Sequence, residues 1–193
     1  MSSTTITAGD LSAGIAVASG NDGTVIIQSG LAGAKVAAIS ISAAGNISVL
    51  ASAAPCFSAY QSTAQTIPNG AVTKIIFQTK LFDTANAFDA TTNYRFQPTV
   101  AGYYQISGAF AGTTTAANLA VCYIYKNGAN SLVGSNAYIS AAGNISATAN
   151  GIIFLNGSTD YVEIFGFQSG TVSMTSIAAA NGTYFQAAMI RPA

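Results

Sequence analysis

The stretch GYYQISGAFA, residues 102–111, decides the fold class of this chain of 193 residues. Its side chains alternate between two faces, with Tyr104, Ile106 and Phe110 on one and Tyr103, Gln105 and Ser107 on the other. Alternation with a period of two residues predicts a β-strand that buries one face, whereas a helix would repeat its apolar positions every three or four residues. The stretch therefore predicts a β-strand and, with the strands that follow, an all-β fold.

Further strands are expected at short spacing through the second part of the chain. They are Asn118–Tyr125, Gly151–Leu155, Thr159–Gln168 and Thr183–Ile190. The sequence Lys126-Asn127-Gly128 predicts a turn, and Asn156-Gly157 predicts a hairpin because Asn-Gly tolerates the positive φ of a type I′ turn. Several short strands joined by Gly and Asn turns predict a sandwich or jelly roll.

The distribution of aromatic residues divides the chain into two parts. All nine Tyr and all ten Phe lie at or after Phe57. Aromatic side chains supply the large buried areas of a core, so residues 1–55 are not expected to build one alone. We predict an anchoring or oligomerisation segment at residues 1–55 and a domain at residues 56–193, with Pro55 stiffening the joint. Strands within the first segment are expected at Thr24–Ser29, Lys35–Ile41 and Asn46–Leu50, with turns at 21–23, 30–33 and 44–46.

Charge is scarce, at 6% of the residues and a formal net charge of zero. Such a surface offers no long-range repulsion between copies, so we expect an oligomer; the alternative is a poorly soluble monomer. Nucleic-acid binding is disfavoured because the basic residues are scattered. They are Lys35, Lys74, Lys80, Arg95, Lys126 and Arg191. No apolar run reaches the ~18 residues of a membrane helix, and residues 1–10 show no signal-peptide pattern, so we expect no membrane insertion and synthesis in the cytoplasm.

The residue types that carry catalysis are rare. The absence of histidine from the sequence removes the commonest general base and most zinc sites. The carboxylates are Asp10, Asp22, Asp83, Asp89, Asp160 and Glu163. Two of them meeting in a cleft could hydrolyse glycosides, but they are dispersed, and Asp83, Asn86 and Asp89 fit a plain surface loop better than a calcium site. We predict a protein without enzymatic activity, catalytic residues, metal or cofactor.

Glu163 and the two cysteines leave alternatives open. Glu163 shares a strand face with Tyr161 and Phe165, where we expect solvent exposure or a Lys or Arg partner; the alternative is an ion pair between subunits. Cys56 and Cys122 are far apart in sequence and fit no metal or redox spacing. Free thiols are preferred, although a disulfide stays possible.

The strands of the second part, over roughly residues 56–192, resemble the C1q/tumour-necrosis-factor-like jelly roll. The most specific piece is FQPTVAGYY at residues 96–104, which resembles the family motif F-x-x-P-x-x-G-x-Y. The other matching pieces, in chain order, are residues 57–60, 74–77 and 82–83, Ile124–Gly128, Leu155–Val162 with Asp160 slightly displaced, and Phe185, Ala187 and Met189 in the last strand. The resemblance implies a ten-stranded jelly roll that forms a homotrimer.

Two departures guide the functional expectation. The chain has neither a collagen-like Gly-X-Y stalk nor a visible signal peptide, and residues 23–28 and 44–49 resemble segments of bacteriophage fibre and virion-surface proteins. We therefore expect a trimeric capsid-decoration, head-fibre or tail-fibre knob protein in the virion. Residues 1–55 would bind capsid or tail proteins, and the knob would bind a host receptor or polysaccharide. The alternative is a secreted C1q-like recognition module unrelated to a virion.

Overall fold

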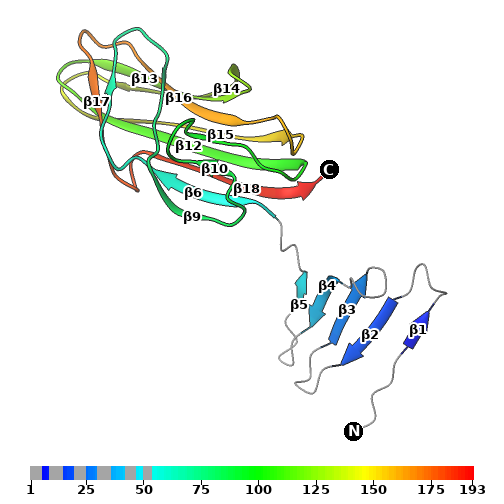
Figure 1. Ribbon diagram of the computed structural model, residues 1–193. Coiled ribbons are helices and arrows are strands. Elements are labelled where there is room, and N and C mark those ends of the chain that lie inside the picture. Colours follow the sequence, from blue (N-terminus) through cyan, green and yellow to red (C-terminus); the bar gives the residue numbers. More distant parts are fainter. Residues whose placement is uncertain (1–5, 9–14, 20–24, 30–35, 42–46, 50–53) are drawn as a thin grey trace. The chain divides into compact units, whose positions relative to one another are not determined.

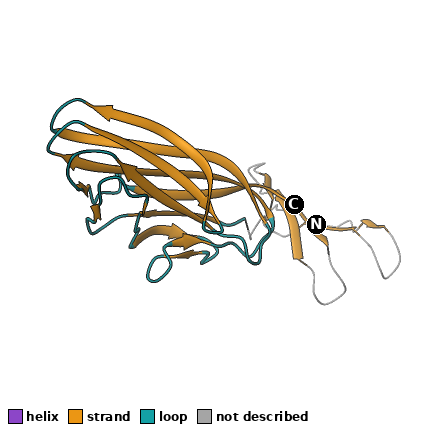
Figure 2. Ribbon diagram, turned by 90° about the horizontal axis from the view of Figure 1, so that it is seen from above, coloured by secondary structure: helices purple, strands orange, loops and turns teal. Residues whose placement is uncertain are grey.

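The computed structural model describes residues 6–8, 15–19, 25–29, 36–41, 47–49 and 54–193. The chain divides into two compact units, residues 1–53 and residues 54–193 (Figure 1). All described secondary structure is β-strand (Figure 2). No helix in these ranges is long and apolar enough to cross a membrane. The all-β prediction is confirmed.

The first unit is a five-stranded antiparallel sheet whose strands pair in chain order. Its strands are β1 (Ile6–Ala8), β2 (Ile15–Ser19), β3 (Val25–Ser29), β4 (Val36–Ile41) and β5 (Ile47–Val49). The last three overlap the predicted strands, whereas β1 and β2 were not predicted, because Ala and Ser give a weak strand signal. The predicted turns fall outside the described residues, as do Asp10, Asp22 and Lys35.

The second unit is a sandwich of two antiparallel sheets (Figure 1). Sheet I has the order β15-β12-β18-β6-β9, with β17 and β7 continuing beside the far end of β12. Its strands are β6 (Cys56–Tyr60), β7 (Thr66–Ile67), β9 (Thr79–Asp83), β12 (Gly102–Thr114), β15 (Gly143–Leu155), β17 (Met174–Ser176) and β18 (Tyr184–Pro192). Sheet II has the order β10-β11-β16-β13-β14, with β8 also paired to β16. Its strands are β8 (Thr73–Lys74), β10 (Phe88–Asp89), β11 (Arg95–Phe96), β13 (Asn118–Lys126), β14 (Ala129–Ile139) and β16 (Val162–Gln168).

The sheets have seven and six strands, where the resemblance implies ten in all, and four of these strands are two-residue segments within the connections. The strand expected at residues 102–111 is β12, and its alternation is confirmed. Tyr104, Ile106 and Phe110 are fully buried between the sheets. The Tyr104 hydroxyl donates to the Val100 carbonyl over 2.7 Å, and burial raises the pKa of this phenol to about 12.

Phenylalanine rings fill one end of the core. The Phe57 ring stacks on Phe88 and Phe96 at centroid distances of 4.6 and 4.7 Å and meets the edge of Phe185 at 4.9 Å. Such aromatic pairs each contribute about 0.5–1.5 kcal/mol beyond the burial of their area. Phe57 and Phe185 lie on paired strands of sheet I, whereas Phe88 and Phe96 come from β10 and β11 of sheet II, so the cluster joins the sheets.

A glycine sets the separation of the sheets near their centre. A Cβ on Gly108 of β12 would lie 2.4 Å from Cδ1 of Ile164 on β16. That distance is far inside van der Waals contact, so a side chain here would push the two sheets apart.

The two Asn-Gly turns behave differently. Asn127 and Gly128 have φ of 53° and 78° and join β13 to β14 as a two-residue hairpin turn, as predicted. The hairpin predicted at Asn156-Gly157 is wrong, because β15 pairs with β12 in sheet I and the next strand, β16, belongs to sheet II. Asn156 Oδ1 accepts backbone N–H bonds from three following residues, which builds a wider loop that crosses between the sheets.

Candidate functional site

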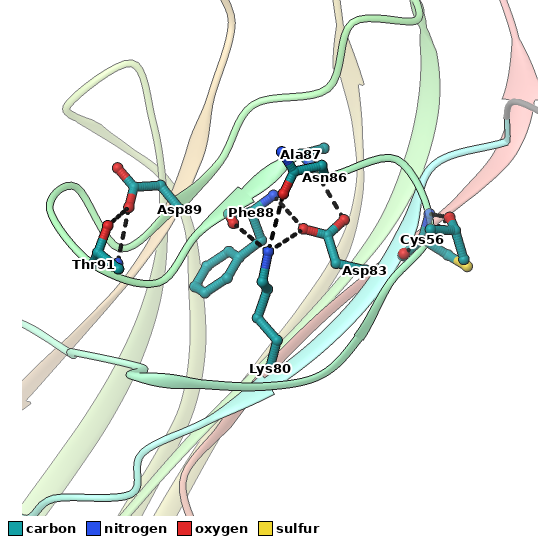
Figure 3. Close-up of polar contacts among 9 residues, drawn as sticks. Cys56, Lys80, Asp83, Asn86, Ala87, Phe88, Asp89 and Thr91 are labelled. Atoms are coloured by element: carbon teal, nitrogen blue, oxygen red, sulfur yellow. Dashed lines mark hydrogen bonds and ion pairs between the residues drawn. The ribbon is translucent and has the colours of Figure 1, made fainter.

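The carboxylates of the second unit are separated from one another, and each is held by its own donors. Asp83 lies at the end of β9, where Lys80 Nζ donates to Oδ2 over 3.1 Å (Figure 3). The backbone N–H groups of Ala87 and Phe88 also donate to this carboxylate, each over 3.0 Å. Burial alone would raise the pKa of Asp83, but these hydrogen bonds outweigh it and hold the pKa below its ordinary value. Asp83 therefore fixes the loop after β9.

Asp89 organises the next turn. Its carboxylate accepts from the backbone N–H groups of Thr91, Thr92 and Asn93 and from the side chains of Thr91 and Asn93. The bonds from the Thr92 and Thr91 N–H groups are the main reason that the pKa of Asp89 lies well below its ordinary range. Asn86, with a φ of 50°, turns its Oδ1 toward Lys80 Nζ at 3.2 Å (Figure 3). The three side chains considered for calcium thus serve as loop formers.

Asp160 connects two turns at one end of the sandwich. Oδ1 accepts from Asn127 Nδ2 at 2.7 Å, and Oδ2 accepts from Lys126 Nζ at 2.9 Å and the Asn156 N–H at 3.1 Å. The bonds from Lys126 and Asn127 are the main cause of a lowered pKa at this carboxyl. Two of the motifs that carry the family resemblance, residues 124–128 and 155–162, therefore meet at one carboxylate.

Glu163 has a lysine partner within the same subunit. It is 7% exposed, and its Oε1 lies 2.5 Å from Nζ of Lys74, a residue of the neighbouring strand β8. The Lys74 ammonium also donates to the Asn93 carbonyl. The expectation of a Lys or Arg partner is confirmed, whereas that of solvent exposure is wrong. The segment around Lys74 and Asn93 covers this face of β16, which the pattern of β16 alone does not show.

The two cysteines are free thiols in different surroundings. Cys122 is fully buried on β13, and burial raises the pKa of its thiol to about 12. Cys56 opens β6 and is partly exposed, with Sγ 3.6 Å from Thr84 Oγ1.

A pocket of about 540 Å³ opens beside the loops that Asp83 and Asp89 organise. It lies at the edge of the sandwich formed by β9, β10 and β11, opposite the edge formed by β14 and β15. Its lining combines amide and hydroxyl side chains with the apolar Ala87, Phe88, Ala90 and Pro98 and with the charged Lys80, Asp89 and Arg95. The sequence did not predict this pocket, because its lining comes from short edge strands, from the loops between them and from Ser158, about 60 residues further along the chain.

The outward face of sheet I is a second candidate surface. Strand register places an almost uncharged set of side chains on it, with Arg191 at one end as the exception among the described residues. Three exposed apolar and aromatic side chains lie together on β12 and β15: Tyr103, Ile152 and Phe154, which are 45%, 62% and 41% exposed. Phe82, on the opposite edge strand β9, is 51% exposed. The Tyr103 and Phe154 rings lie on paired strands with centroids 5.4 Å apart.

The sheet order and the two-layer packing define residues 54–193 as a jelly-roll sandwich of the C1q/TNF type. The solved structures include murine APRIL, which has a TM-score of 0.51 and 12% identity over 71% of this chain and 99% of that one. The globular domain of zebrafish complement 1qA gives 0.51 and 16% over 72% and 99%, and Eiger TNF from S. frugiperda gives 0.50 and 10% over 72% and 93%. At these identities the likeness shows the fold alone. No family model and no curated protein sequence matches the chain.

Proposed function

We propose that this chain is a non-enzymatic structural and adhesion protein that works as a homotrimer on the surface of a bacteriophage particle, as a capsid-decoration or head-fibre protein or a tail-fibre knob. The observation that carries the proposal is the uncharged, partly aromatic outward face of sheet I. Exposed apolar patches that span several strands are typical of interaction surfaces.

A second copy of the chain is the occupant that fits this face best. A surface with almost no charge suits a partner that is also charge-poor, and the chain itself has only 6% charged residues. The β14–β15 edge supplies further exposed apolar side chains, Val133 and Tyr138, at 56% and 70% exposure. A contact between the face of one copy and the edge of the next is heterologous, and such a contact closes into a ring when its rotation permits. A trimer is the ring that the C1q/TNF-like fold favours.

The virion assignment is supported by the organisation of the chain. Residues 1–53 form a compact unit of their own, separate from the jelly roll, and they suit attachment to capsid or tail proteins. The exposed loops of the jelly roll suit contact with a host receptor or polysaccharide. A secreted C1q-like recognition module is equally compatible with the fold and is the alternative.

Light scattering coupled to size exclusion tests the assembly. The wild type is expected to elute with the mass of three chains at micromolar concentration, and Ile152→Asp is expected to lower that mass because it places a charge on the apolar face. Val172→Asp is the matched control, since Val172 is similarly exposed, at 47%, on a loop outside sheet I. A wild type with the mass of one chain would refute the trimer.

Mass spectrometry of purified phage particles tests the location. Presence at a fixed copy number supports a virion protein, and binding of the purified chain to capsids or to host cells separates decoration from adhesion. Recovery from the culture medium and absence from particles would favour the secreted alternative instead.

A further inference from the structure

The pocket beside β9, β10 and β11 carries an inference about a ligand. Most of its polar groups are already used within the protein. Lys80 Nζ donates to Asp83, Asn86 and the Phe88 carbonyl, and the Asp89 carboxylate accepts five hydrogen bonds. The two charges nearest the loops are therefore satisfied without a ligand.

Arg95 is different. It lies directly across the β10–β11 pair from Asp89, but no ion pair joins them, and no carboxylate among residues 54–193 pairs with its guanidinium. One of its amino groups donates to Gln97 Oε1 over 2.8 Å. A guanidinium offers five N–H donors, and the remaining donors of Arg95 make no hydrogen bond within residues 54–193. Arg95 therefore lines the pocket with donor capacity to spare.

The guanidinium is also held in place before any ligand arrives. Its central carbon lies 4.2 Å from the centroid of the Tyr161 ring, so one face of the group is stacked. Gln97 fixes one edge and is itself tied to the Ser158 carbonyl through Nε2 over 3.0 Å. A planar fork held in this way loses little freedom on binding and matches a carboxylate, which accepts two parallel N–H bonds.

The rest of the lining favours a hydroxyl-rich ligand. The Asn86 Nδ2 amide and the Thr99 hydroxyl make no hydrogen bond within residues 54–193, and both side chains are exposed at the pocket. Amides and hydroxyls can replace the water around sugar hydroxyl groups. The volume of about 540 Å³ is large enough for one or two sugar rings.

We propose that this pocket binds a carboxylate-bearing saccharide, with Arg95 pairing with the carboxylate and Asn86 and Thr99 contacting the hydroxyl groups. The inference deepens the proposed adhesive role and rests on it for the origin of the sugar, a polysaccharide on a host surface. The binding chemistry itself does not require the trimer, because every lining residue comes from one chain.

Saturation-transfer NMR and titration with sodium D-glucuronate test the proposal on the full chain. D-glucose is the neutral control, and sodium acetate supplies a carboxylate without the sugar. We expect saturable binding of glucuronate, with weaker binding of both controls. Arg95→Gln is expected to weaken glucuronate binding by about ten-fold or more, because a charge-assisted pair is lost. Arg191→Gln removes the same charge outside the pocket and is expected to leave binding unchanged.

Asn86→Asp is a second pocket variant, and its result can be used even if Arg95→Gln does not fold. Aspartate tolerates the positive φ of this position and keeps an oxygen for Lys80, but its charge would repel the carboxylate. It is expected to weaken glucuronate binding more than glucose binding, because glucose has no charge to repel. The proposal is overturned if glucuronate does not bind saturably, if glucose or acetate binds equally well, or if both pocket variants bind like the wild type. The molar mass, measured by light scattering on the same samples, shows separately whether the chain forms a trimer, so a failure of saccharide binding can be distinguished from a failure of the trimer.

Discussion

Replacing Asp160 with asparagine tests how the two turns that carry the family motifs are held together. The carboxylate accepts on both of its oxygens, from Asn127 on one side and from Lys126 and the Asn156 N–H on the other. The asparagine side chain has one oxygen and one NH2 group. In Asp160→Asn the NH2 group, itself a donor, must therefore face one of the groups that donate to the wild-type carboxylate. Hydrogen bonds to charged groups are each worth about 1.5–3 kcal/mol, and the loss of one or two predicts a destabilisation of about 2–4 kcal/mol.

The destabilisation caused by Asp160→Asn should depend on pH. The pKa of Asp160 is lowered in the folded chain relative to the unfolded value of about 3.9, so its ionised form stabilises the fold. This contribution is complete above about pH 5 and is lost as the pH falls through the folded pKa. Asp160→Asn cannot titrate. The wild type and the variant should therefore differ fully at pH 7 and converge as the solution is acidified.

Urea unfolding at pH 7, 5, 4 and 3 measures this difference, at one protein concentration because an oligomer's stability depends on it. Lys126→Met, alone and combined with Asp160→Asn, isolates the contribution of the ion pair. A wild type and variant whose free energies of unfolding differ by less than about 0.5 kcal/mol at pH 7, or by the same amount at every pH, would refute the reasoning.

Three further experiments test the core. Gly108→Ala is expected to destabilise the jelly roll by about 1–3 kcal/mol in urea, and combining it with Ile164→Val should recover part of the loss; strict additivity would contradict the contact. Tyr104→Phe removes a buried hydroxyl that donates to a backbone carbonyl and should cost about 0.5–1.5 kcal/mol in the same assay, so an unchanged midpoint would count against that bond. In a Cys56→Ser background, Cys122 should react with a thiol reagent only after unfolding, because its thiol is buried with a pKa of about 12; rapid native labelling would disprove this placement.

The parts of the fold that the sequence predicted are those with a strong local pattern. The alternation through Tyr104, Ile106 and Phe110 forces one face inward, and β12 has that geometry. The boundaries were less predictable. Expected strand Gly151–Leu155 is the end of β15, which begins at Gly143, because pairing with β12 extends a Ser-, Thr- and Asn-rich stretch that has little strand preference of its own.

The candidate surfaces depend on long-range placement and could not be predicted from local pattern. Asn156-Gly157 has the composition of a tight hairpin, yet the side chain of Asn156 bonds to the following backbone and the chain crosses to the other sheet. Arg95 looks like one of several scattered basic residues until the folded chain stacks it on Tyr161, 66 positions later, at the rim of a pocket. Only the three-dimensional arrangement distinguishes it from Lys74, Lys80 and Lys126, which all have carboxylate partners.

The first and last strands of the jelly roll are direct neighbours, since β6 pairs with β18 and the Met189 N–H donates to the Pro55 carbonyl. The polypeptide therefore enters and leaves this unit close to the same place. A domain with adjoining ends can be transplanted into a surface loop of an unrelated protein without stretching either linker, and its ends can be joined while new ones are opened elsewhere. Such a domain is suited to exchange between genes that encode otherwise unrelated proteins.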